Sequence, residues 1–200
     1  MVGRLVAIEG IDGSGSEEQT SRLIKYLKKQ GIPCELFTYP DYSNPMGKAI
    51  HDWLHSKDHI PVEGLFLIYA GDMIKDIQKI KSCLREGKTV VLDRYFATTI
   101  AYQGTQGFPR DKALRFAELF GMPEPDISIY LKISAETSME RKKGEKEILD
   151  RNEANKEFLS KVSESFDELV KDSVFGSWFV VDGEKSKQEV FDQIIKILRI

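Results

Sequence analysis

Residues 5–15 read LVAIEGIDGSG, and this stretch decides the fold. Its first four residues form a short apolar run of the kind that is buried on both faces of a sheet. Its second half is rich in glycine, and residues 17–30 then carry Leu23 and Leu27 among charged side chains before Gly31. That spacing indicates a helix that ends at Gly31. The stretch therefore predicts a buried strand, a tight turn and a helix, in that order.

The same alternation of strand and helix continues along the chain. Further apolar runs predict strands, and the amphipathic segments between them predict helices. The predicted strands span residues 5–8, 34–39, 89–92, 127–133 and 178–181. The predicted helices span residues 17–30, 46–56, 61–86 (as one helix or two), 96–105, 110–120, 135–143, 153–171 and 185–199. This order predicts an α/β three-layer sandwich, in which helices flank a mainly parallel sheet of five strands. Ligands bind outside the carboxyl ends of the strands in such a sheet.

Length and composition favour a single enzyme domain. The 200 residues fit one domain, here residues 1–200. A formal net charge of −3 argues against a nucleic-acid coat or a polybasic membrane anchor. Cys34 and Cys83 show no metal-ligand spacing, and we expect both to be reduced. No apolar run approaches the roughly 20 residues that span a bilayer, and no signal-peptide pattern is visible. We therefore expect a cytoplasmic protein that binds neither membranes nor nucleic acid.

The turn at residues 10–15 has the pattern of a Walker A phosphate loop. Glycines let several backbone N–H groups face one anion, and the helix N-terminus adds positive potential. The full signature is G-x-x-x-x-G-K-[ST], but Ser16 stands at the lysine position and Glu17 at that of the Mg²⁺-binding hydroxyl. The pattern still predicts a P-loop NTPase-type fold. The residues expected at the donor nucleotide are Gly10, Asp12, Gly13, Ser14, Gly15, Ser16 and Glu17.

Glu17 has two interpretations. Mg²⁺ favours carboxylate oxygen, so Glu17 could be a metal ligand in place of the missing hydroxyl. Alternatively, Glu17 and Glu18 stabilise the first helical turn through the helix dipole. The whole loop could also be a glycine-rich turn without a ligand, although motifs elsewhere in the chain argue against this.

Further polar motifs flank the other predicted strands. They are YPD at residues 39–41, PMGK at 45–48, DRY at 93–95, TT at 98–99, AYQG at 101–104, PEPD at 123–126, and Arg141 with DRNE at 150–153. Together with EGIDGSG at 9–15 and Gln19, these motifs resemble those of the thymidylate kinases, in the same order. The resemblance implies a nucleoside-monophosphate kinase that uses ATP and Mg²⁺ to phosphorylate dTMP in dTTP biosynthesis. It also implies a homodimer and a small lid at residues 141–153.

The resemblance implies roles for individual residues. Arg94 would bind the acceptor phosphate, Asp93 would organise Mg²⁺ or the acceptor, and Tyr69 would stack on the base. The implied catalytic residues are Asp93, Arg94, Arg141 and Arg151. The implied substrate-binding residues are Asp12, Pro40, Tyr69, Arg94, Thr98, Tyr102 and Gln103. The expected metal ligands are Asp93 and Glu17. On the residues alone, Asp93-Arg94 could instead be a surface ion pair, and Tyr69 and Tyr102-Gln103 could be packing residues.

The chain departs from the family pattern at four positions. Ser16 replaces the loop lysine, Tyr42 and Met73 stand where arginines are expected, and Asn152 replaces a lid aromatic. A loop without its lysine needs positive charge from elsewhere, and we hypothesise that the lid supplies it. The candidate cations are Arg141, Lys142, Lys143, Lys146 and Arg151. Two alternatives stay open: a nucleotide-binding paralogue with little or no kinase activity, and a kinase for another (deoxy)nucleoside monophosphate.

Overall fold

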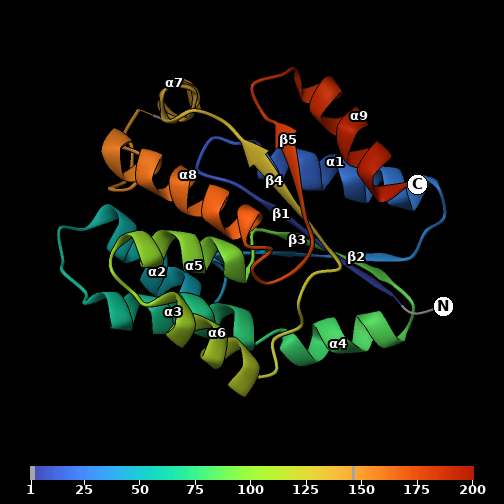
Figure 1. Cartoon of the computed structure of the whole chain (residues 1–200), viewed down its shortest axis with the longest axis horizontal. Coiled ribbons are helices and arrows are strands. Elements are labelled where there is room, and N and C mark those ends of the chain that lie inside the picture. The colour runs from blue at the N-terminus through green and yellow to red at the C-terminus, as the bar shows by residue number, and fades with distance from the viewer. Residues whose placement is uncertain (1–2, 146) are drawn as a thin grey trace.

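The computed structural model describes residues 3–145 and 147–200. At its centre lies a five-stranded sheet in the order β2-β3-β1-β4-β5, and every hydrogen-bonded strand pair in it is parallel (Figure 1). The strands are β1 (Arg4–Glu9), β2 (Cys34–Thr38), β3 (Thr89–Asp93), β4 (Ile127–Lys132) and β5 (Trp178–Asp182). The five predicted strands are confirmed, each to within one residue at either end.

Helices connect the strands. They are α1 (Ser16–Lys29), α2 (Pro45–His55), α3 (Val62–Ile74), α4 (Ile77–Arg85), α5 (Phe96–Thr105), α6 (Arg110–Leu119), α7 (Ala135–Glu145), α8 (Lys156–Lys171) and α9 (Lys187–Leu198). The helical region predicted at 61–86 is two helices, joined at Lys75 and Asp76. α8 begins later than the predicted residue 153, because the Asn155 side chain caps it by accepting a hydrogen bond from the Phe158 N–H at 3.0 Å. Within the described ranges, no helix has the length and apolar character needed to cross a membrane.

Alternate residues of β1 are buried against opposite helix layers. Leu5 and Ala7 belong to the apolar core that includes side chains of α3, α4, α5, α6 and α8. Val6 and Ile8 belong to the core beneath α1 and α9, which lie on the other face of the sheet (Figure 1). This period of two is that of a strand buried on both faces. The predicted three-layer α/β architecture is therefore confirmed.

A smaller apolar cluster joins α2 to α3. Ile50, Trp53 and Leu54 of α2 pack with Leu65 of α3, and Tyr69 lies against them. α2 follows the carboxyl end of β2 after a short connection, so this pair of helices stands at the edge of the sheet where ligands bind.

Candidate active site

The phosphate loop turns tightly between β1 and α1. Gly13 and Gly15 have φ angles of 74° and 88°, in the left-handed region that favours glycine. A Cβ on Gly13 would also lie only 2.9 Å from the carbonyl oxygen of Ser138 in α7. α1 begins at Ser16, and the first N–H groups of a helix lack intrahelical acceptors. The strand, loop and helix predicted from residues 5–15 therefore create a place for an anion.

Ser16, at the lysine position, lies near the carboxylate of Asp93 at the end of β3. Burial raises the pKa of Asp93, and the Ser16 hydroxyl and the charge of Arg94 lower it by less. Asp93 Oδ1 is buried, and no described residue is its hydrogen-bond partner. Glu17, by contrast, is exposed at the edge of the site.

A cavity of about 1250 Å³ extends from the phosphate loop to the wall formed by α2 and α3. Segments that follow β2, β3 and β5 also line it, as does α7. The predicted residues that line the cavity are Asp12, Gly13, Ser14, Gly15, Ser16, Glu17, Pro40, Tyr69, Asp93, Arg94, Thr98, Tyr102, Gln103 and Arg141. Gly10 and Arg151 are not among the lining residues. Gly10 lies just behind the surface, where a Cβ would come within 2.6 Å of Ser14 Oγ.

Asp12, Arg94 and Tyr102 form one hydrogen-bonded group in the cavity. Arg94 Nη2 lies 2.9 Å from Asp12 Oδ1, and Arg94 Nη1 donates to the Gly10 carbonyl oxygen. The Tyr102 hydroxyl donates to Asp12 Oδ2 at 2.9 Å and accepts from the Asp12 N–H at 3.1 Å. Burial and the charge of Asp12 raise the pKa of Tyr102, so its hydroxyl keeps its proton. The group fixes a guanidinium beside the phosphate loop.

Glu9, the last residue of β1, is a buried acid that the sequence analysis did not select. The Thr98 hydroxyl donates to Glu9 Oε2, and Glu9 Oε1 has no partner within the described part of the chain. Burial raises the pKa of Glu9 to about 7, although the Thr98 hydrogen bond and the charge of Arg94 oppose the rise. Thr98, one of the implied substrate-binding residues, therefore also pairs with a side chain of the sheet.

Replacing Glu9 by glutamine is expected to stabilise the fold at pH 8 more than at pH 5. Because the pKa of Glu9 is raised from 4.5 to about 7, the folded state holds the proton more tightly than the unfolded chain does. The stabilisation is complete below pH 4.5 and is lost as the pH rises through 7, a change of about 3 kcal/mol. Glutamine resembles the protonated acid and escapes this loss. Urea unfolding at both pH values measures the effect.

The exposed variant Glu118→Gln is the control for the Glu9 prediction, and it should leave the pH dependence of unfolding as it is in the wild type. If Glu9→Gln shifts the free energy of unfolding equally at pH 5 and pH 8, the raised pKa of Glu9 is contradicted.

The far end of the cavity holds the residues predicted for the base. Gln103 is 1% exposed, and its Oε1 has no partner within residues 3–145 and 147–200. Tyr69 faces the cavity from α3 and Pro40 from the segment after β2. Met73, which stands at an expected arginine position, lies in the main apolar core and not in the cavity. Tyr42, at the other such position, does line the cavity.

α7, which carries the first residues of the predicted lid, contributes Arg141 and Lys142 to the cavity. Arg141 Nη1 donates to the Gly13 carbonyl oxygen at 3.1 Å, and its Nη2 donates to that of Gly183 at 2.8 Å. This arginine therefore links α7 to the phosphate loop and to the turn after β5. Lys142 Nζ lies 2.7 Å from Glu145 Oε2 and 3.8 Å from Glu153 Oε1, with its side chain about three-quarters buried. Its ammonium group is not committed to main-chain carbonyls in any hydrogen bond among the described residues.

Arg151, one of the implied catalytic residues, does not line the cavity and lies at the end of α2. Its guanidinium lies 4.3 Å from the ring centroid of Trp53 and donates to the carbonyl oxygens of Ser56 and Asp58. A planar guanidinium stacks on an aromatic face and still offers several donors, and the end of α2 supplies both kinds of partner. Arg151 thus links the segment between α7 and α8 to the end of α2. Of the other candidate cations, Lys143 is exposed, and Lys146 lies outside the described residues.

Two lysines that follow β5 were missed: Lys185, in the turn before α9, and Lys187, the first residue of α9. Both line the cavity, as do the first residues of α1. The Lys187 carbonyl oxygen accepts a hydrogen bond from Gln19 Nε2 at 2.9 Å, and Lys187 Nζ lies 3.7 Å from Glu18 Oε2. Their position could have been predicted from the sequence, because they follow an apolar strand by a few residues and so lie at the same edge of the sheet as the other motifs.

One cavity thus contains a glycine-rich loop at the start of a helix and a fixed guanidinium, and the fold is that of the P-loop nucleoside-monophosphate kinases. The family model described as thymidylate kinase matches residues 8–194. The chain therefore belongs to the thymidylate kinase family.

Similar proteins span nearly the whole chain. The thymidylate kinase of Synechococcus sp. (strain CC9605) is 32% identical over 203 residues, which cover 95% of this chain and 94% of that protein. That of Homo sapiens is 27% identical over 193 residues and covers 96% and 88%. The solved structure of thymidylate kinase from Candida albicans matches with a TM-score of 0.78 at 26% identity, over 99% of this chain and 92% of that one.

Proposed function

We propose that this chain transfers the γ-phosphoryl group of ATP to dTMP, giving ADP and dTDP for dTTP biosynthesis. The observation that carries the proposal is the position of Arg94, whose guanidinium contacts Gly10 and Asp12 inside the cavity that also contains the start of α1. A donor phosphate at α1 and an acceptor phosphate on Arg94 would be neighbours, as phosphoryl transfer requires. Membership of the thymidylate kinase family supports dTMP as the acceptor.

The acceptor nucleotide is proposed to lie between α3 and α5. Tyr69 stacks on the base, Gln103 hydrogen-bonds its polar edge, and Asp12 with Tyr102 approaches the deoxyribose. Thr98 and Pro40 complete the pocket. The amide oxygen of Gln103 supports this assignment, because a buried polar atom without a partner penalises any acceptor that does not satisfy it.

Mg²⁺ would neutralise charge on the donor phosphates during transfer. Asp93 fits a role in holding this ion, because its Oδ1 is buried at the cavity without a partner among the described residues. Glu17 can supply a second carboxylate from the first turn of α1. One or two carboxylates together with substrate phosphates are a usual environment for Mg²⁺.

Positive charge at the donor side is proposed to come from the lid in place of the loop lysine. Arg141 holds the lid helix on the phosphate loop through its two main-chain acceptors. Lys142 then provides an ammonium group inside the cavity. Ser16 is proposed to orient Asp93 through its hydroxyl, which lowers the pKa of that acid.

The assembly proposed for this kinase is a cytoplasmic homodimer of one domain, residues 1–200, with residues 141–153 as its lid. Exposed apolar side chains on neighbouring helices support a dimer. Leu67 of α3 is 57% exposed and Leu119 of α6 is 79% exposed. The two helices are neighbours, since the rings of Phe66 and Phe116 are 5.1 Å apart.

ADP formation from ATP and Mg²⁺ is expected to depend on dTMP, with kcat/KM at least about tenfold above that for dCMP, dAMP or dGMP. The reason is that the buried amide of Gln103 favours a base whose polar edge can hydrogen-bond with it. A coupled assay over this panel measures the preference.

The same panel separates the alternatives. A maximum on another monophosphate supports a kinase of different specificity. If the native chain phosphorylates no monophosphate and Ser16→Lys restores activity, the chain is a nucleotide-binding paralogue, the alternative that Ser16 suggested. If neither the native chain nor Ser16→Lys phosphorylates any monophosphate, kinase activity is contradicted.

A further inference from the structure

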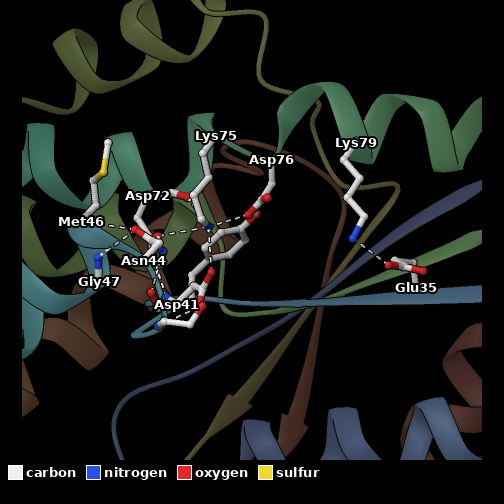
Figure 2. A network of polar contacts seen from close by, with 11 residues as sticks. Glu35, Asp41, Asn44, Met46, Gly47, Asp72, Lys75, Asp76 and Lys79 are labelled. Carbon is white, nitrogen blue, oxygen red and sulfur yellow. Dashed lines mark hydrogen bonds and ion pairs between the residues drawn. The ribbon is translucent and has the colours of Figure 1, made fainter.

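A polar network behind the acceptor side of the cavity centres on Lys75, at the junction of α3 and α4. Lys75 Nζ lies 2.6 Å from Asp76 Oδ2, 3.1 Å from Asp72 Oδ1 and 3.3 Å from Asp41 Oδ2. It also donates to the main-chain carbonyl oxygen of Asp72 at 2.8 Å. Figure 2 shows these three acids converging on one ammonium group. Asp72 itself is 1% exposed.

Asp72 holds the chain that leads from β2 into α2. Its Oδ2 accepts the Asp41 N–H at 2.8 Å, and its Oδ1 accepts Asn44 Nδ2 at 2.6 Å. The Asn44 side chain in turn caps α2, accepting the Met46 N–H at 2.9 Å and the Gly47 N–H at 3.2 Å. One buried carboxylate thereby fixes both the segment and the start of the helix.

Tyr39 provides a second anchor on the same network. Its hydroxyl donates to Asp76 Oδ2 at 3.1 Å, and Lys75 Nζ lies 5.1 Å from its ring centroid. The residues held between and beside the anchors are Pro40 and Tyr42, and both line the cavity. Lys75 does not line the cavity, so any effect on a ligand must pass through these residues.

The charges explain why the network needs its lysine. Asp41, Asp72 and Asp76 would repel one another without a cation, and Asp72 would keep a buried charge with no counter-ion. The hydrogen bonds that Asp72 accepts from the segment would then no longer compensate for burying it. Burial lowers the pKa of Lys75, but the hydrogen bond to Asp76 and the charge of Asp72 raise it further, so the ammonium stays charged.

We propose that Lys75 is a positioning residue for the acceptor nucleotide: it pairs with Asp41, Asp72 and Asp76 and so holds residues 39–44 with Pro40 and Tyr42 at the acceptor side. This inference rests on the proposed function for its effect on the reaction. The positioning of the segment itself does not depend on which nucleotide binds.

Lys79 offers a matched control one turn further on. Its Nζ lies 5.0 Å from the Phe37 ring centroid and 2.9 Å from Glu35 Oε1. Like Lys75 it contacts an aromatic ring, but it pairs with one acid instead of three. Figure 2 shows this pair apart from the network of Lys75. Lys79 therefore shares the chemistry of Lys75 without its hold on residues 39–44.

Lys75→Met is expected to raise the KM for dTMP about tenfold, while kcat and the KM for ATP stay within about twofold. Lys75→Arg keeps the charge and should bring the KM for dTMP back to within about threefold of the wild type. Lys79→Met should change each constant by less than about twofold. Asp41→Asn removes only the ion pair between Lys75 and residues 39–44, and we expect it to raise the KM for dTMP about threefold.

Hydrogen exchange of the amides in residues 39–47 tests the same claim without turnover. We expect faster exchange in Lys75→Met and wild-type exchange in Lys79→Met. If the wild type does not phosphorylate dTMP, the proposed function fails, and the exchange result still decides whether Lys75 positions the segment. Unchanged exchange in Lys75→Met, or a KM for ATP that rises as much as that for dTMP, would overturn the positioning role.

Discussion

Arg94→Met is expected to lower kcat/KM for dTMP by about 10³-fold, equivalent to about 4 kcal/mol. The side chain of Arg94 is only 15% exposed, so its charge acts in a largely water-excluded site. Its removal also frees the carboxylate of Asp12, which would then face the acceptor phosphate with like charge. Steady-state kinetics with dTMP varied at saturating ATP measure the loss.

Two further arginine variants make the Arg94 result specific. Arg94→Lys keeps the charge but loses the fork that spans Asp12 and Gly10, and we expect a loss of about 10–100-fold. Arg110→Met removes an exposed arginine that pairs with Asp172 at 3.0 Å, and we expect a change below about twofold. A loss of less than tenfold in Arg94→Met would contradict the assignment of the acceptor phosphate to this residue.

The meeting of Asp12, Arg94 and Tyr102 could be predicted because their strands are parallel. Asp12 follows β1 and Arg94 follows β3, two adjacent strands whose carboxyl ends share one edge of the sheet. Tyr102 comes from the helix that begins just after Arg94. Apolar runs alone locate the strand ends, so residue order along the chain was enough to bring these side chains together.

The direction in which a side chain points could not be predicted from the order of the strands. Arg151 belongs to a motif at residues 150–153 that was predicted to act at the nucleotide, yet its guanidinium packs on the ring of Trp53, about a hundred positions earlier, and donates to the Ser56 carbonyl oxygen. Glu9 marks the end of an apolar run, which reads as a strand stop. Its buried carboxylate accepts a hydrogen bond from Thr98, which a helix much later in the chain contributes.

The break between α3 and α4 has a similar origin. Ile74, Ile77 and Ile80 continue the apolar spacing across residues 75 and 76, so the local pattern permits one helix or two. The junction is instead occupied by Lys75 and Asp76, which contact Tyr39 and Asp41 of a segment more than thirty residues upstream. Tertiary partners of this kind leave no trace in local periodicity.

Lys142→Met is expected to lower kcat by about 100-fold with a smaller change in the KM for dTMP. The chain has no lysine in its phosphate loop, and the two terminal nitrogens of Arg141 already bind the carbonyl oxygens of Gly13 and Gly183. Lys142 lines the cavity; burial lowers its pKa, but its hydrogen bond to Glu145 and nearby acids raise it further, so its amine stays protonated. A cation that stabilises charge only during transfer acts on kcat.

Lys143 and Ser16 supply the decisive comparisons for the lid lysine. Lys143→Met removes the adjacent, exposed lysine and should change kcat by less than about twofold, because an exposed charge is screened by water. If Lys142 replaces the missing loop lysine, Ser16→Lys in the Lys142→Met background should recover at least about tenfold of the lost kcat. A Lys142→Met enzyme with wild-type kcat would place the compensating charge elsewhere, and Lys185 and Lys187 would then be the next cations in the cavity to replace.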